Sequence, residues 1–166
     1  MILHQIWVGP PRPKHLDRMA ETWREHHPDW DYLLWDDEAI AGLGLRNQDL
    51  YDNAEQLVPA DAVGQYRADI ARYEILHRYG GVYADLDTTC QRPIGPLLPE
   101  GQLVAGWEVQ GKWVGNTVIA APAGHPALAE IIAALPAIAR KYAPAKANKL
   151  SGPKAITPLL RRRKDV

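Results

Sequence analysis

Two aspartates stand one residue apart at the end of a short apolar segment, GVYADLD, at residues 81–87. Side chains alternate between the faces of a β-strand, so Tyr83, Asp85 and Asp87 would share one face. Two neighbouring carboxylates repel each other, and a hard divalent cation relieves that repulsion while it also binds phosphate oxygens. The row therefore predicts a metal that bridges the protein to a diphosphate. The D-x-D spacing taken alone favours a plainer interpretation, a solvated turn with two exposed acids.

A second pair of charged residues precedes this segment. Asp69 and Arg72 are three residues apart in a helix-like stretch, so they share a helix face. Arg72 could hold a phosphate or a sugar hydroxyl, and Asp69 could accept a hydrogen bond from a hydroxyl. Their spacing alone favours a surface ion pair, which contributes little to stability.

The hydrophobic pattern predicts alternating strands and helices that would position these residues. Runs rich in β-branched and aromatic residues predict strands at 2–9, 30–37, 81–87, 102–109 and 116–123. Helical spacing predicts helices at 14–26, 61–79 and 125–143, with the last one broken or restarted near Pro136. The first strand, helix and strand would form a βαβ unit, which implies a right-handed crossover and a parallel sheet. Ligands of open α/β sheets bind at the carboxyl ends of strands, where the aspartate pair would lie.

Length and composition limit the number of domains and the classes of partner. The chain has 166 residues and a formal net charge of −1, which predicts a single domain over 1–166 with no general attraction to nucleic acid. Its one cysteine, Cys90, cannot form an internal disulfide. The first residues, MILHQIWVGPPRP, have neither the charge pattern of a signal peptide nor the length of a membrane span. We therefore expect a cytoplasmic protein.

Residues 67–94, RADIARYEILHRYGGVYADLDTTCQRPI, resemble a known family motif. The motif is that of the DXD-containing glycosyltransferases, the Och1-like mannosyltransferase or sugar-binding-region family, whose core is similar to the clostridial glucosylating toxins. The matching positions are Arg67, Asp69, Arg72, Tyr73, Leu76, Gly80, Gly81, Tyr83, Asp85 and Asp87. Weaker similarities in HQIWVG, LWDD, GNTVIAAPAGHP and LSGP extend the resemblance over residues 2–158.

The resemblance implies a fold, an activity and a cofactor. The fold would be an α/β GT-A arrangement, a Rossmann-like, mainly parallel sheet flanked by helices, in a C-terminally short version. The activity would be that of a retaining hexosyltransferase that moves a sugar from a nucleoside diphosphate donor, a UDP-sugar rather than a GDP-sugar, to an acceptor. The acceptor could be a glycan, a lipid, a protein or a small molecule. The cofactor would be Mn²⁺ or Mg²⁺.

The resemblance also assigns roles around the aspartate pair. Asp87 would bind the metal directly, and Asp85 would contact ribose or the donor sugar and act on the metal through water. Asp69 and Arg72 would hold the donor sugar, and Asn116 would lie near the sugar that is transferred. Asp85, Asp87 and Arg72 are thus the expected catalytic residues.

Four further residues are expected on the nucleotide. Trp7 would stack on the base, which the backbone of Ile6 would also hold, and Tyr83 would pack beside the nucleotide. Asp36 is a looser candidate for the nucleotide, because it is also suited to cap a short helix. The alternative for Trp7 is a place in the hydrophobic core.

Two other functions compete with sugar transfer. One is a nucleotide-sugar-binding module without efficient transfer, or a slow donor hydrolase. The other is a nucleotidyltransferase, which typically has a glycine-rich basic loop near the first strand; here VGPPRPK has only one glycine. The tail, SGPKAITPLLRRRKDV, is expected to border the site, with Ile156, Leu159 and Leu160 on the sheet and Lys154 or Arg161–Arg163 near the diphosphate. The alternative is that the site stays open and that a second subunit or the acceptor closes it.

Overall fold

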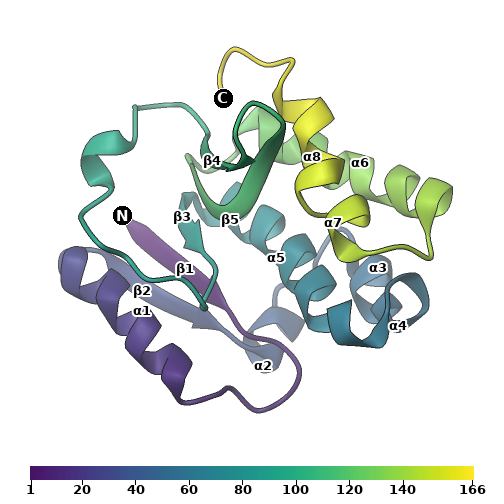
Figure 1. Ribbon diagram of the computed structural model, residues 1–166, viewed down its shortest axis with the longest axis horizontal. Helices are drawn as coiled ribbons and strands as arrows, with labels where there is room; N and C mark the ends of the chain where they lie inside the picture. The colour runs from purple at the N-terminus through teal and green to yellow at the C-terminus, as the bar shows by residue number, and fades with distance from the viewer.

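The computed structural model describes residues 1–166 and contains one five-stranded sheet in the order β2-β1-β3-β5-β4 (Figure 1). The strands are β1 (Ile2–Ile6), β2 (Asp31–Trp35), β3 (Gly81–Ala84), β4 (Val104–Val109) and β5 (Trp113–Ala121). β1 pairs in parallel with β2 and β3, whereas β5 is antiparallel to both β3 and β4. Four strands thus point the same way, and the expected α/β class with a mainly parallel sheet is confirmed.

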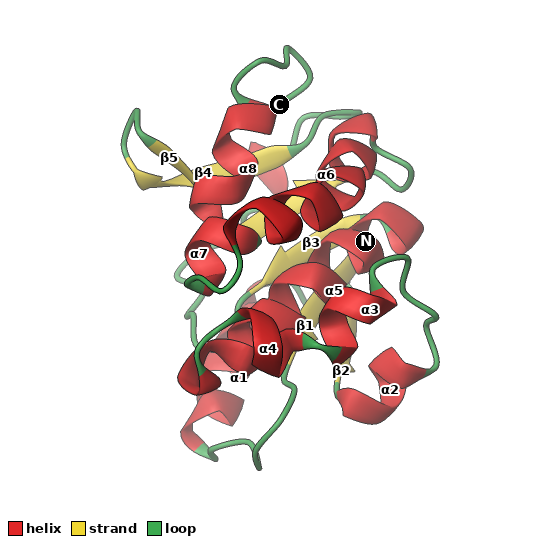
Figure 2. Cartoon of the chain, turned by 90° about the vertical axis from the view of Figure 1, so that its right-hand side faces the viewer, coloured by secondary structure: helices red, strands yellow, loops and turns green.

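Helices cover both faces of this sheet (Figures 1 and 2). They are α1 (His15–His26), α2 (Asp37–Ala41), α3 (Gln48–Asp52), α4 (Ala54–Leu57), α5 (Val63–Tyr79), α6 (Pro126–Tyr142), α7 (Ala147–Leu150) and α8 (Pro153–Leu160). Short 3-10 turns occupy Ala60–Ala62 and Gly95–Leu97. No helix combines the length and the apolar composition that crossing a bilayer would require.

The two faces of β3 carry different chemistry, as the alternation of its side chains predicts. Val82 and Ala84 pack with Trp23 of α1 in a small apolar cluster on one face. Tyr83 belongs to the larger core on the other face, which contains the apolar residues of α5 and α6. The polar residues that follow Tyr83 in the same row are therefore directed toward α5.

Two glycines allow α5 to lead directly into β3. Gly80 ends the helix with φ at 65°, and Gly81 begins the strand with φ at 100°, both in the left-handed region. A Cβ atom on Gly81 would lie 2.3 Å from the backbone oxygen of Ile2. The close pairing of β3 with β1 thus requires glycine at this position.

The expected break in the helix at Pro136 does not occur, because α6 runs without interruption from Pro126 to Tyr142. Proline lacks the N–H that would bond to the carbonyl four residues earlier. Here the side chain of Asn47 donates to that carbonyl, on Ile132, at 3.0 Å. Asn47 is itself held in place by Glu74, whose carboxylate accepts from its backbone N–H at 2.9 Å. A partner from another element thus replaces the missing hydrogen bond.

The C-terminal segment forms two helices, of which α8 packs on β5 and α7 packs on α5, α6 and α8. Ile156 and Leu160 of α8 are buried, as expected, and Leu159 is half-buried. The hydroxyl of Thr157 accepts from the backbone N–H of Val114 in β5 at 2.9 Å, which ties α8 to the strand. The segment is therefore part of the fold and not a loose end.

Candidate active site

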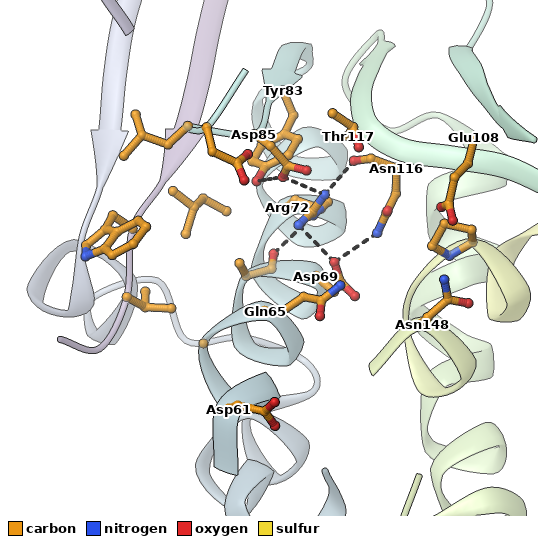
Figure 3. A pocket seen from close by; sticks show the side chains of 18 of the residues that line it. Asp61, Gln65, Asp69, Arg72, Tyr83, Asp85, Glu108, Asn116, Thr117 and Asn148 are labelled. Carbon is orange, nitrogen blue, oxygen red and sulfur yellow. Dashed lines mark hydrogen bonds and ion pairs between the residues drawn. The ribbon is translucent and has the colours of Figure 1, made fainter. Parts of the chain in front are cut away.

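A pocket of about 670 Å³ opens at the carboxyl ends of β1 and β3, where the strand pattern predicts a ligand. β1 and the loop after it form one wall, α5 forms the floor, and β5 with α7 and α8 forms the other wall (Figure 3). The pocket brings together eight of the nine residues that the sequence selects: Ile6, Trp7, Asp69, Arg72, Tyr83, Asp85, Asp87 and Asn116.

Arg72 is the centre of this pocket, and it is buried with only 3% of its surface exposed. Its guanidinium is 2.8 Å from the carboxylate of Asp69 and 3.0 Å from that of Asp85. It also donates to the backbone oxygen of Asn116 at 2.5 Å. The spacing of Asp69 and Arg72 favoured an exposed ion pair, and that interpretation is wrong. A buried charge needs a partner, and here one guanidinium is paired with two carboxylates.

Asp69 is anchored by neutral donors in addition to Arg72. Its oxygens accept from the side-chain amide of Asn116 at 2.9 Å and from the hydroxyl of Ser151 at 2.7 Å. Burial raises the pKa of Asp69, and the Arg72 charge and these two hydrogen bonds oppose that rise. Ser151 thereby links the C-terminal helices to the floor of the pocket.

Tyr83 and Asp85 occupy adjacent places in the polar row of β3. The Tyr83 hydroxyl donates to Asp85 at 2.7 Å, and the Arg72 guanidinium lies 4.4 Å from the centre of the Tyr83 ring. Burial raises the pKa of Tyr83 well above its usual value, so the phenol keeps its proton and remains a donor. Asp85 keeps 26% of its side chain exposed, and it lines the pocket.

Asp87 differs from the residues of the floor. It lies in the turn after β3, is exposed, and its carboxylate makes no hydrogen bond or ion pair. The turn itself is fixed, since the Trp23 indole donates to the backbone oxygen of Thr88 at 3.0 Å. A free carboxylate on Asp87 beside a partly exposed Asp85 is a donor set that suits a hard divalent cation, which often takes only one or two carboxylates from the protein.

Of the residues expected on the nucleotide, some line the pocket and Asp36 does not. Trp7 is half-buried at the pocket wall, and its indole N–H donates to the backbone oxygen of Pro10 at 2.7 Å. Asp36 does not line the pocket; it caps α2 by accepting from Ala39 N–H at 2.9 Å. Its neighbour Asp37 accepts from the backbone of Gly9, so it steadies the loop that follows β1.

Sequence reasoning missed several polar residues of the pocket. Asp61 and Gln65 precede Asp69 by eight and four residues, and all three line the pocket. That helical spacing of polar residues was a usable signal. Glu108 and Asn148 line the opposite wall, and nothing in the sequence near them pointed to the site. The expected approach of Lys154 and Arg161–Arg163 is not observed, because none of these side chains lines the pocket.

Comparison with known proteins agrees with this geometry. Residues 13–104 match the family described as glycosyltransferase sugar-binding region containing DXD motif. Inositol phosphoceramide mannosyltransferase 3 of Schizosaccharomyces pombe is 32% identical over 141 residues, which are 85% of this chain and 38% of that protein. Mannosyl phosphorylinositol ceramide synthase SUR1 of Saccharomyces cerevisiae is 32% identical over 75% of this chain and 31% of its own length. The chain thus spans less than half the length of these relatives.

Solved structures show the same fold at low identity. The PaToxG glycosyltransferase has a TM-score of 0.78 and 18% identity, over 97% of this chain and 67% of its own. The UDP-bound glycosyltransferase domain from the YGT toxin has a TM-score of 0.65 and 11% identity, over 97% and 76% of the two chains. These similarities confirm the GT-A fold. With a family match that covers more than half of its residues, the chain belongs to the DXD-containing glycosyltransferase sugar-binding-region family.

Proposed function

We propose that this chain is a metal-dependent, retaining glycosyltransferase that moves a hexose from a nucleoside diphosphate sugar to an acceptor hydroxyl. The observation that carries the proposal is that two neighbouring carboxylates line one pocket, Asp85 held by the buried Arg72 and Asp87 without a protein partner. A UDP-sugar is favoured as donor, since a structural neighbour is described as UDP-bound.

Different residues of the pocket would bind the diphosphate, the base and the sugar of the donor. Asp87, with Asp85 beside it, would hold Mn²⁺ or Mg²⁺, which neutralises charge on the leaving diphosphate. Trp7 would stack on the base, next to the backbone of Ile6, as aromatic rings do with nucleobases. Asp69 and Asn116 would orient the sugar hydroxyls at the floor of the pocket.

Arg72 has a narrower role than the sequence suggested. Four of its contacts are with protein acceptors: Asp69, Asp85 and the backbone oxygens of Ala68 and Asn116. A guanidinium has five N–H donors, and these protein acceptors use much of that capacity. We therefore assign Arg72 first to positioning the two carboxylates and second to binding the sugar.

The reaction exchanges one glycosidic bond for another. The bond between the anomeric carbon and the diphosphate oxygen breaks, and the acceptor oxygen forms a bond to the same carbon. The acceptor proton leaves with a phosphate oxygen of the departing nucleoside diphosphate. If both oxygens share one face of the sugar, the configuration is retained and no protein nucleophile is required.

Among glycans, lipids, proteins and small molecules, a lipid is favoured because two relatives are named inositol phosphoceramide mannosyltransferase and mannosyl phosphorylinositol ceramide synthase. A cytoplasmic location stays a prediction.

The decisive experiment measures thermal stabilisation by UDP-sugars and GDP-sugars, with Mn²⁺ and with EDTA, followed by assay of released UDP or GDP. We expect stabilisation by a UDP-sugar that depends on the metal. Equal binding and full activity in EDTA would refute metal dependence. Release of free sugar without transfer to any acceptor would identify the slow hydrolase instead.

A further inference from the structure

The hairpin formed by β4 and β5 exposes large apolar side chains next to the pocket. Trp107 is 45% exposed and Val109 is 46% exposed, on the strand at the edge of the sheet. Figure 2 shows the hairpin projecting beside α8. Large exposed apolar groups that gather on one surface typically mark an interaction site.

Three basic side chains surround these apolar groups. The Lys112 and Lys154 ammonium groups lie 5.7 and 5.9 Å from the centre of the Trp113 ring, and the Arg161 guanidinium lies 5.8 Å from that of Trp107. Arg161 also donates to the backbone oxygen of Gly111 at 2.9 Å, which fixes the hairpin to α8.

None of these three cations has a carboxylate within ion-pairing distance. Nearby Arg163 differs, because it is paired with both Glu130 and Asp165. We call this set the hairpin face; its members are the exposed Trp107, Val109, Lys112, Lys154 and Arg161 and the half-buried Trp113. The face therefore combines aromatic rings with uncompensated positive charge.

The hairpin face borders the mouth of the pocket. Glu108, between Trp107 and Val109, lines the pocket, and so does Pro153, which precedes Lys154. A surface that docks at the face would therefore lie beside the opening through which an acceptor must enter.

We propose that the hairpin face docks on an anionic phospholipid surface and so presents a membrane-borne acceptor to the pocket. Tryptophan prefers the headgroup level of a bilayer, where its ring is in an apolar region and its N–H meets water. Basic side chains are attracted to anionic headgroups. The overall charge of −1 does not oppose this, because the attraction acts within a Debye length of the local cations.

Two other occupants fit the face less well. A second copy of the chain would bring cations against cations. An added strand from a partner would need a regular edge, and β4 has register irregularities between Ala105 and Trp107 and between Trp107 and Val109. The docking can be measured without any sugar transfer; only the claim that it presents the acceptor rests on the proposed function.

The test is co-sedimentation with phosphatidylcholine vesicles that contain or lack phosphatidylserine. We expect binding only to the anionic vesicles, and release at high salt. Lys154→Glu with Arg161→Glu should lower partitioning by at least about 25-fold, since each basic residue contributes about fivefold. Trp107→Ala with Val109→Ala should also weaken binding. The matched control is Arg46→Glu with Arg140→Glu, two exposed cations at a groove between α3 and α6, which should change little.

Each contrary result has a defined meaning. Equal binding by wild type and both hairpin variants, or no binding by wild type, would overturn the docking proposal. Dimers that the Trp107→Ala, Val109→Ala variant dissolves would identify a second copy as the occupant. Loss of UDP binding in Lys154→Glu, Arg161→Glu would place these cations in the donor site and also overturn it. Retained UDP binding without vesicle binding would leave the proposed donor site intact.

Discussion

The floor and the rim of the pocket are built in opposite ways. On the floor, Asp69 and Arg72 are almost wholly buried, and their charged groups are paired with other protein groups. On the rim, Asp87 is exposed and its carboxylate has no protein partner. Buried charges contribute to stability only while they remain paired, whereas an exposed and unpaired acid contributes little.

Because of this difference, the effects of mutation on the folding free energy and on donor binding should be separable. A change on the floor should alter both the folding free energy and donor binding. A change on the rim should alter donor binding alone. The following variants are arranged to test that separation, beginning with the largest expected effect.

Arg72→Ala should destabilise the protein most. It leaves the carboxylates of Asp69 and Asp85 without their cation, and removing one partner of a buried ion pair costs about 3–5 kcal/mol. Urea denaturation measures the loss, and Arg72→Lys should recover part of it while keeping the charge. A loss below about 1 kcal/mol would show that the floor is not a structural unit.

Asp87→Asn should leave stability within about 0.5 kcal/mol of wild type, because the residue is exposed and unpaired. It should nevertheless lower kcat/KM by at least about 100-fold, since a metal contributes several kcal/mol to charge stabilisation. The measurements are urea denaturation and turnover across a Mn²⁺ titration. Activity that excess Mn²⁺ restores would assign Asp87 to metal affinity, and activity unchanged at every Mn²⁺ concentration would contradict the proposal.

Ser151→Ala tests whether the C-terminal helices belong to the floor. Its hydroxyl donates to Asp69 in a fully buried position, and a hydrogen bond to a charged group contributes about 2 kcal/mol. We expect that loss of stability together with weaker donor binding. Thr157→Ala is the matched control, because it removes another buried hydroxyl, whose hydrogen bonds are to the backbones of Val114 and Pro153 and not to a carboxylate of the pocket. It should destabilise without changing donor affinity.

Local sequence patterns predicted the framework and the shared face of the polar residues at the end of β3, but not the burial of the floor. Alternation along residues 81–87 placed Tyr83 and Asp85 on one face, and helical spacing located α1 and α5, because both patterns are local. The burial of Asp69 and Arg72 was not foreseen. It depends on Ser151 and Asn116, which are 82 and 47 residues from Asp69 in the chain.

The same limit explains the errors outside the pocket. Pro136 was expected to interrupt a helix, and the compensating donor, Asn47, lies 85 residues from the carbonyl that it satisfies. Asp36 is separated from the pocket by its cap on α2, even though its type suits a nucleotide. Residue types and spacing reveal which groups could do chemistry, whereas long-range contacts decide which of them meet.

Trp7→Ala should have the smallest effect on activity. It tests whether the rim contacts the base of the nucleotide. The ring is half-buried and tied to the loop through Pro10, so the alternative is that it serves mainly as packing. If it stacks on the base in both ground and transition states, its loss should raise the donor KM about fivefold with little change in kcat, near the lower end of measured base stacking, about 1 kcal/mol. Trp7→Phe keeps a ring but not the indole N–H and should fall between. A variant that loses stability while the donor KM is unchanged would assign Trp7 to the fold, and the rim would then lack a contact for the base.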